Sequence, residues 1–163
     1  MGFDVNNCRF DPGRRKDLLH LAQVKEIFEA GRIKPAVVHV ESHPYLPQWD
    51  LLDYCRKNGI VLQAFAALGH SSEPKLLDDP VITAIVKRVN KTPAQVLLAW
   101  AIQRGTALLT TSKTPSRIKE NFEVSTLPEE AVREISEGIK SRVRFNAVVE
   151  TGVPGFIPRG KGG

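Results

Sequence analysis

Apolar side chains follow two spacings along the chain, one typical of buried strands and one typical of helices. Short apolar runs predict strands at residues 3–6, 36–40, 60–66 and 107–111. Between these runs apolar residues recur every three or four positions, which predicts helices at residues 16–30, 48–58, 80–89, 93–104, 114–121 and 126–140. This alternation of strands and helices predicts an α/β fold with a parallel sheet.

Two of the predicted helices carry clear start signals. Asp79 followed by Pro80 supplies an N-cap and a first-turn proline. Thr92 and Gln95 have the spacing of a capping box, in which each side chain bonds the other residue's backbone. The stretch before the first of these helices, residues 68–79, has no clear period and is predicted to be a long loop.

The number of strands limits the architecture. A (β/α)₈ TIM barrel needs about 250 residues, whereas this chain has 163 residues and four strand signals, each apolar enough for a sheet covered by helices. We therefore expect half of a (β/α)₈ barrel, built from four parallel βα units in residues 1–142, followed by an irregular tail at residues 143–163. Such a half barrel would have two open edges, so we expect two copies to close it as a homodimer.

Composition argues against several function classes. The net charge of +5 is dispersed among acidic residues, which argues against a nucleic-acid surface. We expect no membrane span and no signal peptide, and hence a cytoplasmic location. Cys8 and Cys55 are read as free thiols, and no spacing of His, Cys, Asp and Glu predicts a metal site.

Several long motifs occur in a characteristic order. They are Gly31–Val37 (GRIKPAV), Val40–Leu46 (VESHPYL), Leu51–Cys55 (LLDYC), Lys91–Leu98 (KTPAQVLL) and Ser112–Asn121 (SKTPSRIKEN). From Gly31 onward the chain resembles the second half of an aldo-keto reductase. The resemblance implies a barrel half that binds a nicotinamide dinucleotide, normally NADP(H).

The resemblance also implies which residues contact the cofactor. Ser112, Arg117, Glu120 and Asn121 match positions that hold the adenosine and its 2′-phosphate, and a guanidinium suits a phosphate. Nearer the nicotinamide, the matching residues are Asn7, Phe65 and Leu68.

The sequence departs from the family pattern at several of these places. Thr110 and Thr111 replace the usual proline and lysine before Ser112, which puts selectivity for the 2′-phosphate in doubt. His39 replaces a glutamine and His70 replaces a serine, so the resemblance implies a pocket with different lining side chains near the nicotinamide.

The family's proton-donating tetrad of Asp, Tyr, Lys and His lies on the first four strands and has no match here. Histidine titrates near neutral pH, and Glu41 lies two residues after His39 in a predicted strand, on the same face. The first hypothesis is therefore an acid–base enzyme that uses His39, Glu41 and His70, needs no cofactor, and isomerises, dehydrates or cyclises a small carbonyl metabolite.

Two alternatives stay open. The chain is an NADP(H)-binding oxidoreductase module that needs a partner carrying the first barrel half, or it is a non-catalytic binding protein or degenerate fragment. His43 is expected to support structure, and Trp49 and Trp100 are expected to pack in the core or at the surface.

Overall fold

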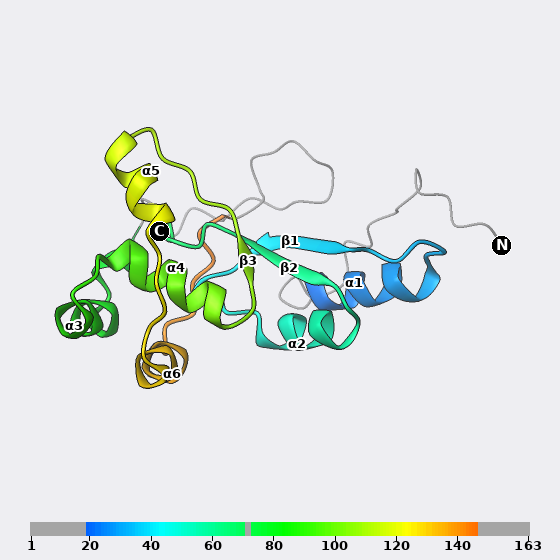
Figure 1. Cartoon of the computed structure of the whole chain (residues 1–163). Helices are drawn as coiled ribbons and strands as arrows, with labels where there is room; N and C mark the ends of the chain where they lie inside the picture. Colours follow the sequence, from blue (N-terminus) through cyan, green and yellow to red (C-terminus); the bar gives the residue numbers. More distant parts are fainter. Residues whose placement is uncertain (1–18, 71–72, 147–163) are drawn as a thin grey trace, which may run out of the picture.

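The computed structural model describes residues 19–70 and 73–146, which form an α/β fold (Figure 1). The elements in chain order are α1 (Leu19–Ala30), β1 (Val37–Glu41), α2 (Trp49–Lys57), β2 (Val61–Phe65), the 3₁₀ helix η1 (Leu76–Asp78), α3 (Pro80–Val89), α4 (Pro93–Gln103), β3 (Ala107–Leu108), α5 (Pro115–Phe122) and α6 (Glu129–Gly138). The predicted α/β class is confirmed. The predicted strand at residues 3–6 lies outside the described residues.

The three described strands form a parallel sheet in the order β1-β2-β3. β3 has two residues, although five were predicted. The register explains this, because Ala64 pairs with Leu108 and its carbonyl accepts from the backbone N–H of Leu109 at 3.0 Å. The partner strand ends just beyond, where Ala66 takes a positive φ of 52°. Thr110 and the residue after it therefore lie beyond the end of the neighbouring strand.

The two faces of the sheet differ. Helices α1 and α2 lie on one side of the sheet (Figure 1). On that side Val40 and Leu62 are buried with Leu51, Leu52 and Cys55 of α2 in one apolar cluster. On the other face Val37 is 50% exposed and Val61 is 47% exposed. The expectation that helices cover the sheet is thus wrong for this second face within the described residues. An open face is what the interior side of half a barrel would present.

A second apolar cluster gathers α3, α4 and α6 (Figure 1). The predicted helix starts are confirmed: the Asp79 carboxylate accepts from the N–H of Val81 at 2.8 Å, and Thr92 and Gln95 form the capping box. The last helix ends at Gly138 rather than near residue 140, because Ile139 turns to extended backbone and is buried in the cluster.

Arg104 lies where the two clusters meet. Its guanidinium lies 4.2 Å from the ring centroid of Trp49 and 4.5 Å from that of Trp100, and it donates to the carbonyl of Pro47. Burial and the nearby Arg56 lower the pKa of Arg104 to about 9. Trp100 is buried whereas Trp49 is 36% exposed, and the buried guanidinium of Arg104 packs against both rings.

The described helices do not resemble membrane spans. None of them combines the length and the hydrophobicity that a bilayer crossing requires. Cys55 is a buried free thiol in the described part of the chain, as predicted, and Cys8 lies outside that part.

Candidate functional site

A cleft of about 390 Å³ opens beside the first turns of α4 and α5. We call it the α5 cleft. Its lining residues come from the loop after β2, the start of α4, the segment leading into α5, and α5 itself; they are Leu68, Leu77, Asp78, Pro93, Ala94, Thr111, Ser112, Arg117, Glu120 and Asn121. Five of the seven predicted cofactor-contacting residues, namely Leu68, Ser112, Arg117, Glu120 and Asn121, therefore share one cleft.

The first turn of α5 brings positive charge to this cleft. Pro115 begins the helix, and the Ser112 hydroxyl accepts from the N–H of Thr114 at 3.1 Å, which fixes the approach. The Arg117 side chain is exposed and makes no hydrogen bond or ion pair with any described residue. The first backbone N–H groups of a helix also lack partners inside the helix. This part of the cleft is suited to an anion.

Glu120 is held in place from α4. The Thr92 hydroxyl donates to the Glu120 carboxylate while its oxygen accepts from the N–H of Gln95 at 3.2 Å. The Gln95 side chain in turn donates to the carbonyl of Glu123 at 3.2 Å. The capping box of α4 thus fixes the orientation of α5, so the lining of the cleft is preformed.

The other two predicted cofactor residues lie elsewhere. The Phe65 ring packs against His39, with ring centroids 5.1 Å apart, and Phe65 does not line the α5 cleft. Asn7 falls outside the described residues. Among described residues no group of three His, Cys, Asp or Glu side chains could hold a metal.

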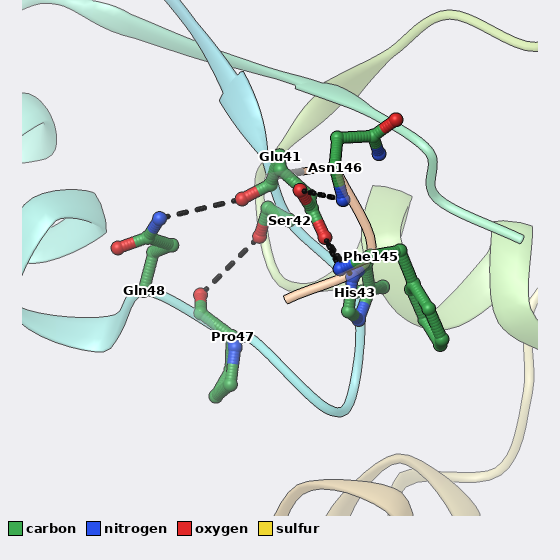
Figure 2. Close-up of polar contacts among 7 residues, drawn as sticks. All are labelled: Glu41, Ser42, His43, Pro47, Gln48, Phe145 and Asn146. Atoms are coloured by element: carbon green, nitrogen blue, oxygen red, sulfur yellow. Dashed lines mark hydrogen bonds and ion pairs between the residues drawn. The ribbon is translucent and has the colours of Figure 1, made fainter. Parts of the chain in front are cut away.

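The second polar region lies at the carboxyl end of β1 (Figure 2). Glu41 is 1% exposed, and its Oε1 atom lies 2.9 Å from Nε2 of His43. Backbone N–H groups of Phe145 and Asn146 donate to the same carboxylate at 2.6 Å and 3.0 Å. Because an ionised carboxylate can only accept, Nε2 of His43 is assigned the hydrogen. We call these four residues the Glu41 cluster.

Hydrogen bonds decide the ionisation of Glu41. Burial alone raises the pKa of this carboxyl, but the bonds from His43, Phe145 and Asn146 outweigh it and lower the pKa to about 2. The carboxylate therefore stays charged and saturated near neutral pH. A group with such a low pKa is a poor general base.

The turn after β1 is fixed by its own polar contacts (Figure 2). The Ser42 hydroxyl donates to the carbonyl of Pro47 at 3.4 Å, and the Gln48 side chain donates to the carbonyl of Glu41 at 3.3 Å. Tyr45, within this turn, donates to the Asp79 carboxylate at 3.0 Å. The motif at residues 40–46 thus connects the end of β1 to Asp79, which is distant in the sequence.

The three predicted catalytic residues are not brought together as a set. His39 is exposed on the open face of the sheet and makes no hydrogen bond with Glu41. The described partners of the Glu41 carboxylate are His43 and the backbone of Phe145 and Asn146. His70 is exposed in the loop after β2. The expected His39–Glu41 pair does not form, because long-range backbone donors bind the carboxylate; catalytic roles for His39 and His70 stay predictions.

Sequence reasoning missed residues at both regions. Leu77 and Asp78 line the cleft from η1, inside the stretch predicted to be a loop. Phe145 lies in the predicted tail, yet it is buried in the second apolar cluster. The available signal was weak, since it was a single aromatic residue beside Arg142 and Arg144.

Comparisons with known proteins agree on one family. The Aldo/keto reductase family model matches residues 19–140. Aldo-keto reductase family 1 member A1 of Sus scrofa is 34% identical over 86% of this chain and 46% of its own length. Glycerol 2-dehydrogenase (NADP(+)) of Hypocrea jecorina is 35% identical over 73% of this chain and 40% of its own length.

A solved structure extends the match to the fold. The crystal structure of an aldo/keto reductase from Brucella melitensis superposes with a TM-score of 0.65 and 31% identity, covering 71% of this chain and 44% of that one. The chain spans less than half the length of these relatives. Its parallel α/β architecture is part of a TIM barrel, as predicted. Family model, relatives and structure together show that the chain belongs to the aldo/keto reductase family.

Proposed function

We propose that the chain is the NADP(H)-binding part of an oxidoreductase and that the α5 cleft holds the phosphate-bearing adenosine end of the dinucleotide. The observation that carries this proposal is Arg117, an exposed cation at the cleft with no polar partner among the described residues. The name of the Hypocrea jecorina relative includes NADP(+), which supports the same cofactor here.

The residues of the cleft suit such a ligand. Arg117 presents a planar fork of donors for a 2′-phosphate, and the Ser112 hydroxyl adds a neutral donor. Glu120 and Asn121 provide an acceptor and an amide for the edge of an adenine base, and Leu68 offers apolar surface. When bound, the reduced dinucleotide supplies a hydride; these side chains bind and orient it.

The cleft also carries a difference from the family pattern. Thr111, which stands where the family usually has lysine, lines the cleft with an uncharged side chain. Discrimination between NADPH and NADH therefore depends more on Arg117 than it would with a second cation beside the phosphate. We expect a preference for NADPH that Arg117 controls.

Carbonyl reduction needs a proton donor as well as a hydride. The positions of this sequence that match the family do not include its tetrad, and the described geometry does not give Glu41 that role. We therefore propose that reduction of a small carbonyl substrate takes place only together with the first half of the barrel. The homodimer predicted from the open edges stays a prediction, and an identical copy would add no tetrad.

Cofactor titration tests the proposal. Quenching of protein fluorescence by NADPH and by NADH is measured for the wild type, Arg117→Ala and Arg117→Lys, with Arg88→Ala as the matched control because Arg88 pairs with Glu134 away from the cleft. Loss of a charge-assisted hydrogen bond predicts about 10- to 100-fold weaker NADPH binding in Arg117→Ala, a smaller loss in Arg117→Lys, and little change for NADH. A wild-type protein that does not bind millimolar NADPH would contradict the proposal.

A further inference from the structure

A short segment near the end of the described residues is hydrogen-bonded to the end of β1 and to the turn that follows it. We call residues 143–146 the strap. The N–H of Val143 donates to the carbonyl of Tyr45 at 3.1 Å, and those of Phe145 and Asn146 donate to the Glu41 carboxylate. The strap has no helix or strand of its own. Its attachment to the fold therefore relies on these bonds and on the packing of the Phe145 and Val143 side chains against the second apolar cluster.

Phe145 connects the strap to the loop that follows β2. The ring is 4% exposed and lies 4.9 Å from the His43 ring and 6.0 Å from the Tyr45 ring, centroid to centroid. A methyl group placed on Gly69 would lie 3.3 Å from Cε2 of Phe145 and 3.0 Å from Cβ of Leu76. The ring is thus packed between the turn after β1 and the loop containing Gly69.

That loop is also a wall of the α5 cleft. We call residues 66–70 and 73–79 the cleft loop; it supplies Leu68, Leu77 and Asp78 to the lining. Gly69 takes a φ of 79°, and its N–H bonds the carbonyl of Ala66 at 2.8 Å, so the backbone turns tightly where it meets Phe145. Displacement of the Phe145 ring therefore removes a packing contact of Gly69, which is next to the cleft-lining Leu68.

A second contact joins the same elements. The Tyr45 hydroxyl donates to the Asp79 carboxylate, at the end of the cleft loop. Burial and the Asp79 carboxylate raise the pKa of Tyr45 to about 12, so the hydroxyl keeps its proton and continues to donate. The cleft loop is therefore supported at Gly69 by Phe145 and at Asp79 by Tyr45, and the strap binds to Tyr45 and Glu41 beneath both.

We propose that Glu41 is a positioning residue for the α5 cleft: by fastening the strap it keeps Phe145 under the cleft loop, so that strap attachment and dinucleotide binding stabilise each other. The cofactor part of this inference rests on the proposed function. Detachment of the strap is a local opening that competes with the closed state. If the ligand binds the closed state better, the coupling is reciprocal, and each event strengthens the other by the same factor.

Residue-specific amide exchange, followed by NMR without cofactor, tests the positioning role. Glu41→Gln keeps the side-chain size but leaves one acceptor oxygen for the three donors. We expect exchange on the order of tenfold faster at Phe145 and Asn146 and also at Gly69 and Asp78, whose N–H groups bond within the cleft loop. Glu134→Gln, which removes the same charge from an exposed pair, is the matched control and should leave these four rates unchanged.

The cofactor experiment tests the coupling. NADPH should slow amide exchange at Phe145 and Asn146 in the wild type. Glu41 does not line the cleft. Even so, Glu41→Gln should weaken NADPH binding by about the same factor as it speeds amide exchange in the strap. The inference is overturned if Glu41→Gln speeds exchange in the strap but not at Gly69 or Asp78. Absence of NADPH binding to the wild type would instead refute the proposed function, and the cofactor-free rates would then decide the positioning role.

Circular dichroism shows whether the Glu41→Gln protein folds. If it does not fold, a second variant tests the same inference. Phe145→Leu removes the ring beside Gly69 but leaves the backbone donors and Glu41 in place. We expect faster exchange at Gly69 and Asp78 while the Asn146 amide stays protected. Unchanged rates at Gly69 and Asp78 in this variant would overturn the inference.

Discussion

The Glu41 cluster and the α5 cleft each contain a charged side chain, but the two side chains differ in burial and in hydrogen bonding. Glu41 is buried, and its carboxylate accepts hydrogen bonds from His43, Phe145 and Asn146. Arg117 is exposed and has no polar partner among described residues. The Glu41 carboxylate is hydrogen-bonded within the protein, whereas the Arg117 guanidinium is available to a ligand. Residue type alone therefore does not identify a functional site; the state of the hydrogen-bonding groups does.

The largest expected effect separates the two regions by stability. Glu41→Ala leaves two buried donors and the half-buried N–H of Asn146 without an acceptor, and we expect it to lower the free energy of unfolding by about 3–5 kcal/mol. Arg117→Ala should change it by less than about 0.5 kcal/mol, because the side chain is exposed. Urea denaturation measures both. Equal losses in the two variants would show that Glu41 and Arg117 do not differ in their contribution to stability.

Acid should remove the contribution of Glu41 selectively. Its pKa falls from 4.5 to about 2 on folding, so its stabilisation is complete above pH 4.5 and is lost as the pH drops toward 2. The shift corresponds to about 3 kcal/mol. We expect the difference in unfolding free energy between wild type and Glu41→Gln to shrink by about this amount between pH 6 and pH 2. A difference that stays constant over this range would mean that Glu41 is not the titrating group.

A smaller effect is expected at the frame of the cleft. Thr92→Ala removes the N-cap of α4 and the bond to Glu120, which should lower the free energy of unfolding by about 1 kcal/mol. Thr92→Ser keeps the hydroxyl and serves as its control. Thermal unfolding of the two variants should therefore differ, with the serine protein close to wild type; identical losses would point to the lost methyl group instead.

Local signals predicted most of the helices and strands. Asp79 before Pro80 and the pairing of Thr92 with Gln95 act within a few residues, so the sequence reveals them directly. The clustering of Arg117, Glu120 and Asn121 was also predictable, because successive turns of one helix place them together.

Long-range contacts were not predictable in this way. The period-two rule placed Glu41 beside His39, but its backbone partners lie 104 and 105 residues further along the chain. The short β3 likewise follows from where β2 ends rather than from its own apolar residues. Packing of Phe145 against Gly69 depends on the same tertiary arrangement.

The tryptophan pair around Arg104 gives the protein a built-in optical reporter. The chain has two tryptophans, and their ring centroids lie 6.2 Å apart at one junction, so its tryptophan emission comes from a single place. That place is the contact between α2 and α4, with the guanidinium packed over both indoles. Emission should therefore register separation of the two apolar clusters without any attached dye.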